Sequence, residues 1–479
     1  MDYEAVIGLE VHLHLNTKTK AFCGCSTAFG SEPNTQVCPV CLGLPGSLPV
    51  LNQQALDFAI IVALALNCKV QEYTKFDRKH YFYPDLPKNY QISQYDLPLS
   101  RNGFLDIYLD AIPKRIGILR IHLEEDAGKL IHQDEESLVD FNRTGIPLLE
   151  IVSEPEISSP QEAHEYLSAL KSIIEYLGVS DCDMEKGSLR CDTNISIREK
   201  GSKQLGTKAE LKNLNSFKAV KDALSFEIKR QSEILKSGNA IVQETRLWDV
   251  KEAKTLSMRT KEGAQDYRYF PEPDLPPFII KKVKIEKLRS DIPELPREKL
   301  VRFCKVYGLS EYEAKILVFS KKDAAFAEDL IKSYQETNKK PLVNWLIGPF
   351  ASVASANNYT ISELEIPGGK SELISLIRSV EEGRISNLMA KNVFTESINN
   401  NIPASKIVQD KNLFQISDTS SLETEVDRVI NENPKSVQDF YAGKSNAVMF
   451  LVGQVMKKTK GKANPKVVQE ILKRRLSDA

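Results

Sequence analysis

Five stretches in the first 250 residues alternate apolar side chains with side chains that can bind cations or phosphates. In residues 7–14, the two-residue period of a strand puts Gly8, Glu10, His12 and His14 on one face. Carboxylates and imidazoles are ligands of Mg²⁺ and Mn²⁺, and Lys and Arg suit phosphate. The other stretches put the following on one face: Arg120, His122 and Glu124; Arg190, Asp192, Asn194, Ser196 and Arg198; Lys208, Glu210 and Lys212; Glu244 and Arg246.

For any one of these stretches the ordinary explanation is an antiparallel sheet with one wet face. Five in one region, with all six histidines in the first 164 residues, favour a functional face. A concave sheet lined in this way could hold a nucleotide with its metal ions and stabilise a phosphoryl group in transfer. Around residue 120, Leu119, Ile121 and Leu123 are predicted to form the apolar face of the strand.

Four cysteines form two close pairs. Cys23 and Cys25 are separated from Cys38 and Cys41 by twelve residues, and two such pairs can surround one tetrahedral Zn²⁺. Four thiolates fill the coordination sphere, so this zinc would be structural and not catalytic. The alternatives are four unrelated thiols, or a redox pair at Cys38 and Cys41. The spacing favours zinc.

Common nucleotide-binding and catalytic motifs are missing. Gly369-Lys370-Ser371 resembles the end of a P-loop, but position 364 is Leu where that motif needs Gly. The sequence also has no G-x-S-x-G elbow, no G-x-G-x-x-G and no kinase catalytic-loop set. Any use of ATP would therefore need a site of another kind.

The composition is that of a globular protein. The 479 residues are 42% hydrophobic and 27% charged, with 64 Lys and Arg against 65 Asp and Glu. These values exclude a chain disordered throughout and a basic field over the whole molecule. The longest apolar run, residues 58–66, is too short to span a membrane. Because the N-terminus does not resemble a leader, we expect a cytoplasmic protein whose eight cysteines are thiols or metal ligands.

The sequence pattern predicts an α+β chain with three domains. Strand patterns dominate residues 1–292, helical patterns dominate 293–405 after a proline-bracketed linker, and 406–479 form a small helical tail domain. In the helical part, Leu300, Phe303, Cys304 and Tyr307 have the spacing of an amphipathic helix. Asn464-Pro465 predicts the start of the last helix.

The tail is basic. Residues 441–479 hold nine Lys and Arg against two Asp and Glu, whereas residues 401–440 hold four against seven. A solvated helix face with cations near its C-terminus explains this pattern, and so does contact with a nucleic-acid backbone. The candidate residues are Lys457, Lys458, Lys460, Lys462, Lys473, Arg474 and Arg475.

Several long motifs resemble one family. They are GLEVH at 8–12, RIHLEEDAGK at 120–129, DFNRTGIPLLE at 140–150, GSLRCD at 187–192, KNLNSF at 212–217 and DYRYFPEPD at 266–274. Together they resemble the B/E family of tRNA-dependent amidotransferase subunits, over essentially the whole chain. The E type carries an extra domain before its helical part, and the chain has no room for that insert after Pro277. The resemblance is therefore to the bacterial B type.

The resemblance implies an antiparallel-sheet cradle followed by a helical domain and a small tail that binds tRNA. It implies a glutamine-dependent ligase that uses ATP with Mg²⁺ or Mn²⁺ to phosphorylate the side-chain carboxylate of glutamate or aspartate misattached to tRNA. Ammonia, brought through a tunnel from a partner amidase subunit, then displaces phosphate, and a small third subunit completes a heterotrimer. The alternative is a non-catalytic, tRNA-binding scaffold of the same complex.

The resemblance also assigns residues. Glu10, His12 and Glu125 match positions that the family uses for metal; Glu124, Asp126, Glu150 and Asp192 are further acidic candidates, for which sheet salt bridges are the alternative. The strand period puts Glu125 on the wrong face, and a bulge at Glu124–Glu125 would reconcile this. Lys79 could lie where ammonia arrives, or be a loop lysine. The candidates for phosphate, with sheet salt bridges as the alternative, are Arg190, Lys208 and Arg246.

Overall fold

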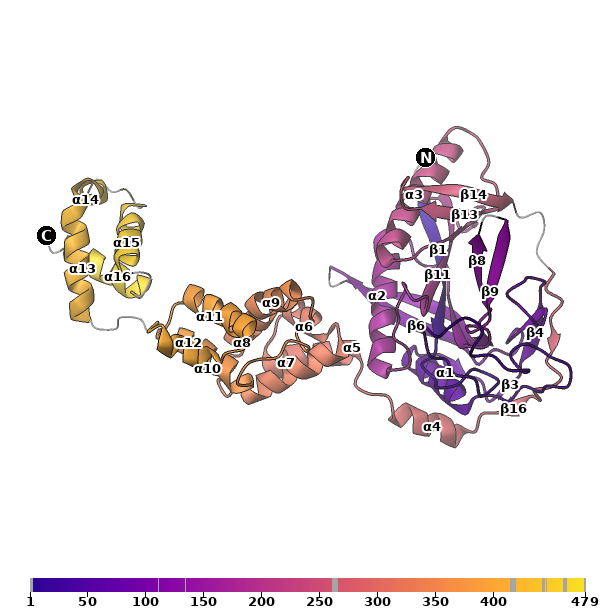
Figure 1. The fold of residues 1–479 in the computed structure, drawn as a ribbon. Helices are drawn as coiled ribbons and strands as arrows, with labels where there is room; N and C mark the ends of the chain where they lie inside the picture. The colour runs from indigo at the N-terminus through magenta and orange to yellow at the C-terminus, as the bar shows by residue number, and fades with distance from the viewer. Residues whose placement is uncertain are drawn as a thin grey trace. The chain divides into compact units, whose positions relative to one another are not determined.

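The computed structural model describes residues 3–477 apart from 111, 134, 261–265, 414–418, 442–443, 445 and 460–462. It divides into two compact units, residues 1–296 and 297–479 (Figure 1). The described strands all lie in the first unit, and the second is helical. The predicted α+β class is confirmed, and the unit boundary lies four residues after the predicted end of the first domain.

A nine-stranded sheet is the framework of the first unit. Its order is β14-β13-β12-β11-β1-β10-β7-β6-β2, and of the pairs in it only β12 and β13 are parallel within the described residues. Each of the five predicted stretches lies in one of these strands. Their bounds are β1 Tyr3–His14, β2 Lys69–Val70, β6 Ser100–Leu109, β7 Ile112–Glu125, β10 Pro147–Ser153, β11 Leu189–Glu199, β12 Ala209–Lys212, β13 Glu244–Asp249 and β14 Lys254–Thr260.

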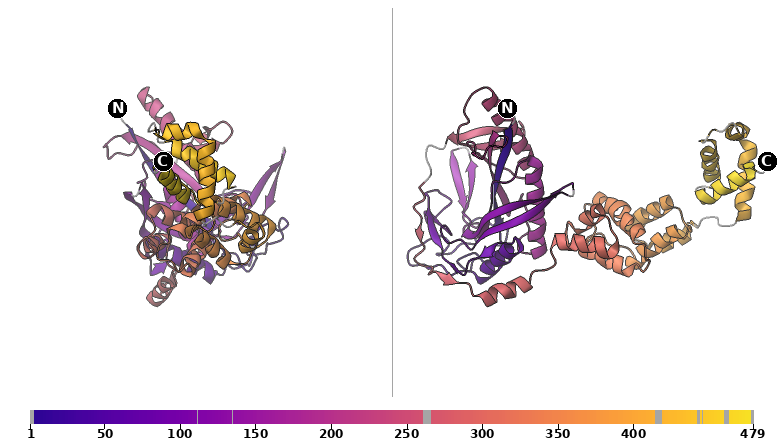
Figure 2. Two further views of the ribbon diagram at one scale, coloured as in Figure 1. Left: turned by 90° about the vertical axis from the view of Figure 1, so that its left-hand side faces the viewer. Right: turned by 180° about the vertical axis from the view of Figure 1, so that it is seen from behind.

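Three helices bury the apolar face of this sheet: α1 Gln53–Ala65, α2 Pro160–Leu177 and α3 Phe217–Lys236 (Figures 1 and 2). Ser159 caps α2 through the Glu162 amide, and Gly178 ends it in the left-handed conformation. The alternation in β1 directs every second side chain into this core, where Ile7, Leu9, Val11 and Leu13 are each at most 1% exposed. The intervening polar residues are left on the opposite face.

Smaller elements lie on the polar side of the sheet, where Figure 1 shows β4, β8 and β9. A three-stranded sheet has the order β15-β4-β5, and β16 pairs with β3 and β8 with β9. The four-cysteine loop precedes α1. The bounds are β3 Tyr73–Thr74, β4 Asp77–His80, β5 Tyr90–Ser93, β8 Lys129–Gln133, β9 Glu136–Asp140, β15 Phe270–Pro271, β16 Phe278–Ile279 and α4 Lys282–Ser290.

The second unit is built of helices. The predicted amphipathic helix is α5, with Leu300 and Phe303 buried, and Pro465 is the first residue of α16 as predicted. Residues 422–476 share an apolar cluster of their own. The bounds are α5 Pro296–Tyr307, α6 Glu311–Val318, α7 Lys321–Ser333, α8 Lys340–Trp345, a π-helical turn Leu346–Phe350, α9 Ala351–Ala356, α10 Lys370–Glu381, α11 Asn387–Asn400, α12 Ala404–Asp410, α13 Thr419–Glu432, α14 Pro434–Tyr441, α15 Asn446–Lys458 and α16 Pro465–Ser477.

No helix among the described residues has the length and apolar character needed to cross a membrane.

One strand departs from the predicted alternation. The β10–β7 ladder shifts register between Val152 and Ser153, whose partners are Arg120 and Ile118, so Leu119 has no partner in it. Leu119 is 41% exposed and Ile118 is buried in its place. The prediction that Leu119 shares the apolar face is therefore wrong, because a bulge shifts the alternation by one residue.

We predict that Gly103→Ala destabilises the first unit. A methyl group at Gly103 in β6 would collide with the Cys68 sulfur and lie 2.7 Å from the Leu66 carbonyl oxygen. Overpacking of this kind costs about 1–3 kcal/mol of unfolding free energy. In a Trp345→Phe background, Trp248 fluorescence in urea reports on this unit.

Gly8→Ala is the matched control, because its methyl group would meet nothing closer than 3.9 Å. Equal urea midpoints for the two variants would contradict this account of β6.

Candidate functional site

Antiparallel pairing sets one row of polar residues across four central strands. His12 of β1 lies opposite Arg190 of β11 on one side and Glu150 of β10 on the other, and Glu150 lies opposite His122 of β7. Glu124 follows His122 by two residues and so faces the same side. The register alone thus gathers two imidazoles, two carboxylates and a guanidinium.

The side chains of this row form a compact group. His12 Nε2 lies 3.3 Å from Glu150 Oε2 and 3.9 Å from Glu124 Oε1. His122 Nε2 lies 3.5 Å from a carboxylate oxygen of each acid. One ligand atom from each of His12, Glu124 and Glu150 falls within 4.8 Å of the others, and both acids are buried. Two carboxylates and an imidazole this close fit a divalent cation such as Mg²⁺ or Mn²⁺.

The charges of this group depend on one another. Burial raises the pKa of the Glu150 carboxyl, but His122 and His12 outweigh this and hold it well below its usual range. Burial also raises the pKa of Glu124, but the hydrogen bond from His122 and the Lys79 charge outweigh burial and the charge of Glu150, so the net shift is downward. Burial lowers the pKa of His12, while its contacts with Glu150 and Glu124 raise it above the usual value. Both carboxylates are ionised at neutral pH.

Glu10 lies on the same face, one row away. It pairs in register with Asp192, and its carboxylate accepts a 3.0 Å hydrogen bond from Asn194. Burial and the charge of Glu150 raise the pKa of Glu10, so its ionised form is strained by neighbouring acids. A bound cation would relieve that repulsion. The predicted ligand Asp192 is instead paired with Lys212 at 2.6 Å.

Glu125 lies apart from this group. The β10–β7 ladder runs without a register shift from Arg120 to Glu125, so the bulge proposed at Glu124–Glu125 is absent. The buried Glu125 carboxylate accepts the Ile92 amide at 3.0 Å and a short contact from the Lys88 ammonium. The strand period gave the correct face, and the geometry does not bring Glu125 to His12.

Asp126 is also held elsewhere. Its carboxylate contacts His14 at 2.6 Å, Arg190 at 2.8 Å and Arg143 at 3.4 Å. Burial raises its pKa, but Arg190 and His14 outweigh this and leave it strongly lowered. Asp126 is therefore an ionised anchor for two arginines, one of which continues the central row.

Lys79 faces the acid group from β4. Burial lowers its pKa, whereas Glu124, Tyr269 and Glu150 raise it, and the net shift is upward. The Lys79 ammonium lies 5.0 Å from the centre of the Tyr267 ring. Lys79 is thus a charged part of the site, not a solvent-exposed loop lysine.

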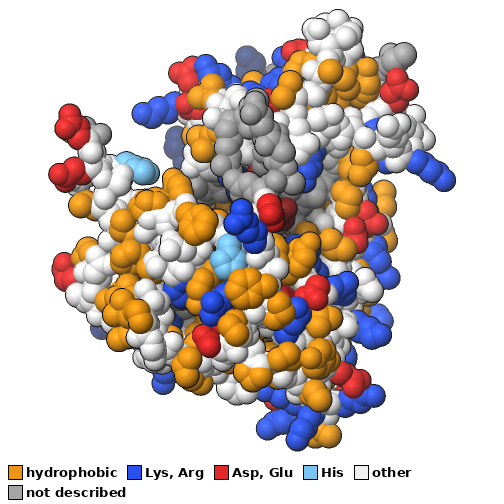
Figure 3. All heavy atoms as spheres, turned by 90° about the vertical axis from the view of Figure 1, so that its right-hand side faces the viewer, with side chains coloured by type: hydrophobic (Ala, Val, Ile, Leu, Met, Phe, Trp, Pro, Cys, Tyr) orange, Lys and Arg blue, Asp and Glu red, His pale blue; other side chains and the backbone are white. Residues whose placement is uncertain are grey.

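Sequence reasoning missed the residues that place this lysine. Arg78 forms two 2.8 Å hydrogen bonds with Glu272, which fasten β15 to β4. Tyr267 and Tyr269 are thereby held near Lys79, with Tyr269 stacked on Tyr95 at 4.2 Å. Figure 3 faces this side and shows hydrophobic side chains gathered around a histidine and several Lys or Arg. The aromatic spacing in DYRYF was the available signal.

The predicted phosphate ligands are divided. Arg190 lies in the central row, but Lys208 is exposed and precedes β12. Arg246 lies 2.5 Å from Glu244 and 3.1 Å from Glu227 of α3, so it binds the sheet to the helix layer. Here the salt-bridge alternative describes the geometry. Lys212 was named only for its strand face and is the cation that reaches the polar row.

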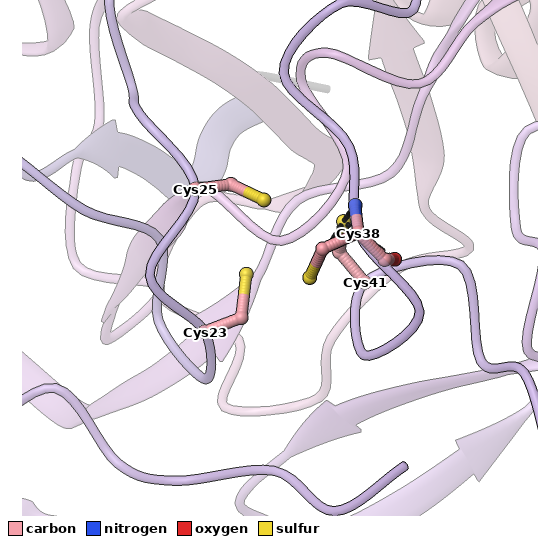
Figure 4. A group of neighbouring side chains, drawn as sticks. All are labelled: Cys23, Cys25, Cys38 and Cys41. Atoms are coloured by element: carbon pink, nitrogen blue, oxygen red, sulfur yellow. Dashed lines mark hydrogen bonds between the residues drawn. The ribbon is translucent and has the colours of Figure 1, made fainter.

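The four cysteines come together as their spacing predicts (Figure 4). The sulfur atoms of Cys23, Cys25, Cys38 and Cys41 all lie within 4.8 Å of one another. A hydrogen bond from Cys23 lowers the pKa of Cys41 to about 4, and burial and Cys38 raise that of Cys25 to about 11. Such a shared-proton cluster fits a tetrahedral metal that would replace the protons.

In the tail, three of the predicted cations are paired within the domain. Lys458 contacts Glu432 at 2.5 Å, Arg475 contacts Glu423 at 3.1 Å, and Arg474 makes a short contact with Glu423. Lys457 and Lys473 are exposed. Lys460 and Lys462 lie outside the described residues.

The fold and the site define an enzyme-like cradle: an open, mostly antiparallel sheet whose wet face gathers carboxylates, imidazoles and cations, with a four-cysteine loop beside it. The chain belongs to the GatB/GatE family, since residues 5–286 match its catalytic domain and residues 325–476 match the GatB domain. The family resemblance of the motifs is thereby confirmed.

Full-length relatives agree, and all three described here are B-type subunits of aspartyl/glutamyl-tRNA(Asn/Gln) amidotransferases. The chain is 54% identical to the relative from Carboxydothermus hydrogenoformans, over 99% of both chains. It is 55% identical to the relative from Caldanaerobacter subterraneus, over the whole of both chains. The relative from Brevibacillus brevis is 52% identical, over 98% of this chain and 99% of its own.

We predict that Mn²⁺ binds the group formed by His12, Glu124 and Glu150. Glu150→Gln removes one of two anionic ligands and should weaken Mn²⁺ binding about tenfold or more, as measured by electron paramagnetic resonance of free Mn²⁺. Glu125→Gln, whose carboxylate is held by Lys88, should keep the affinity of the unmodified protein. The reverse order of effects would contradict the assignment.

Proposed function

We propose that this chain is the subunit of a tRNA-dependent amidotransferase that activates the side-chain carboxylate of glutamate or aspartate misattached to tRNA. The full-length similarity to B-type subunits of aspartyl/glutamyl-tRNA(Asn/Gln) amidotransferases supports the substrate class. The observation that carries the activating role is the group of His12, Glu124 and Glu150 on the open sheet face.

The reaction follows from the chemistry of a carboxylate, which is a poor acyl donor at neutral pH. An oxygen of the aminoacyl carboxylate attacks the γ-phosphorus of ATP, the bond to the β-phosphate oxygen breaks, and an acyl phosphate and ADP form. Ammonia then attacks the acyl carbon and inorganic phosphate leaves, which gives the amide. Water would hydrolyse the acyl phosphate, so the site must shelter it.

The residues of the polar face suit this sequence of steps. His12, Glu124 and Glu150 would hold Mg²⁺, with Glu10 beside them; a bound divalent cation neutralises phosphate charge during transfer. Arg190 adds a fixed positive charge at the end of the same row, where it can orient phosphate oxygens. Lys212 offers a second cation on this face.

Lys79 suits a different role. Its ammonium is charged and lies among Tyr267, Tyr269 and the acid group, where it can orient the aminoacyl carboxylate or the acyl phosphate. The rings beside it restrict access of water. We place the entry of ammonia on this side of the cradle.

The nitrogen is supplied by partners. The sequence has no G-x-S-x-G elbow, and the proposed reaction consumes ammonia. We therefore assign glutamine hydrolysis to an amidase subunit, with ammonia passing through a tunnel and a small third subunit completing a heterotrimer. The relatives are themselves named as one subunit of an amidotransferase, which fits a complex of several subunits.

Two further parts are assigned here. The four-cysteine cluster would hold one structural Zn²⁺, which the sulfur geometry fits. The tail would bind the tRNA backbone through its exposed lysines, Lys457 and Lys473, while its paired cations stabilise the helical domain.

We predict that Glu10→Gln, in the assembled complex, lowers cleavage of ATP that depends on charged tRNA by about 100-fold or more. The amide cannot supply the negative charge that a cation on this face requires, whereas tRNA binding should be unchanged. ADP release and filter binding of glutamyl-tRNA measure the two quantities.

Glu4→Gln is the matched control, because Glu4 lies on the same strand but pairs with Arg198 at 2.6 Å. Unchanged ATP cleavage in Glu10→Gln would favour the alternative, a scaffold that only positions tRNA for another subunit.

A further inference from the structure

A buried lysine lies beside the four-cysteine cluster. Lys20 is 0% exposed. Its ammonium donates to the Gln36 carbonyl oxygen at 2.7 Å, to the Phe141 carbonyl oxygen at 3.3 Å and to the Cys41 sulfur at 3.7 Å. A buried ammonium is costly unless a negative charge compensates it.

The contacts recorded for Lys20 include no carboxylate: among the described residues, no Asp or Glu oxygen forms an ion pair with it within 4.0 Å. Both oxygen acceptors are neutral carbonyls. The remaining acceptor is a cysteine sulfur, which is anionic when it binds a metal. A Zn²⁺ ion with four thiolates has a net charge of −2, so the cluster is the anion that this site requires.

We propose that Lys20 is the counter-ion of the metal–thiolate cluster and that it fastens the cluster to the loop of residues 141–146. This inference rests on the proposed zinc, but not on the proposed reaction. Lys20 is a positioning residue, since it touches a ligand of the metal and no atom of the substrate.

The loop that Lys20 holds leads to the cation site. The Ala21 amide donates to the Gly145 carbonyl oxygen at 2.8 Å, and the Gly145 amide donates to that of Asp126 at 2.8 Å. The Asp126 amide in turn donates to the Ile146 carbonyl oxygen at 2.9 Å, just before β10 begins. Through Lys20, the cluster is thus joined to the ends of β7 and β10, which carry Glu124 and Glu150.

The close fit around Lys20 restricts what can replace it. Gly145 has a positive φ of 84°, and a methyl group there would lie 3.4 Å from the Lys20 side chain. A neutral side chain of similar length is therefore the least disruptive change, and Lys20→Gln keeps a donor for the two carbonyl oxygens while removing the charge.

The first test is release of zinc to a chromogenic chelator from the full chain. We expect one zinc per chain in the unmodified protein, and release about 10–100-fold faster in Lys20→Gln. Lys20→Arg, which keeps the charge, should stay within about threefold of the unmodified rate. Lys18→Gln, at an exposed position two residues away, is the matched control. Equal release from folded Lys20→Gln and Lys18→Gln would overturn the proposal.

A second test uses cobalt in place of zinc and reports on charge. An ammonium beside the Cys41 sulfur stabilises the electrons of that thiolate. The sulfur-to-cobalt charge-transfer band should therefore move to lower energy in Lys20→Gln and return in Lys20→Arg. An unmoved band would show that Lys20 only fills space.

If Lys20→Gln does not fold, the unmodified protein labelled with ¹⁵N-lysine decides. One ammonium signal, lost in Lys20→Arg, should shift when cadmium replaces zinc, and no such shift would overturn the proposal. Absence of zinc from the unmodified protein would refute the cluster itself and leave the proposed reaction to its own test.

Discussion

The repulsion between carboxylates on one sheet face is the constraint on which this site depends. Glu10, Glu124 and Glu150 lie on neighbouring strands, and Glu150 raises the pKa of Glu10. Like charges at this separation need a positive partner. Two imidazoles and Lys79 supply part of it, and a divalent cation would supply the rest. The same arrangement that is unfavourable for an empty sheet is favourable for binding a metal and the phosphates of a nucleotide.

The remainder of the first unit keeps these charges in place. Helices α1, α2 and α3 bury one face of the sheet, so the strands cannot turn their polar residues inward. The bulge at Leu119 sets the alternation that brings His122 and Glu124 to the wet face. Arg78 and Glu272 close the aromatic segment over Lys79, and the four-cysteine loop is tied to the strand ends near Asp126.

The sequence predicted the strands well because their alternation is strict. The polar faces of β1 and β11 and the cysteine cluster needed only a period of two and a ligand spacing. What failed depended on contacts distant along the chain. Arg246 shares its face with Glu244 as predicted, but the acid that binds it from the helix layer, Glu227, comes from α3. Leu119 was misplaced because a bulge depends on the partner strand.

Two residues show the limit of a family resemblance beside the limit of strand geometry. For Glu125 the alternation argued against the metal site, and the structure puts its carboxylate on Lys88. For Glu150 no spacing argument existed, since its place opposite His12 and His122 arises only when β10 pairs between β1 and β7. Antiparallel register, and not spacing along the chain, assembles the site.

The central claim is that this face gathers a divalent cation between three named side chains. Anomalous scattering from crystals grown with Mn²⁺ tests it most directly. The account predicts a manganese peak bounded by His12 Nε2 and the carboxylates of Glu124 and Glu150. A cradle with no anomalous peak at saturating Mn²⁺, or with its peak at Glu125 and Lys88 instead, would contradict it.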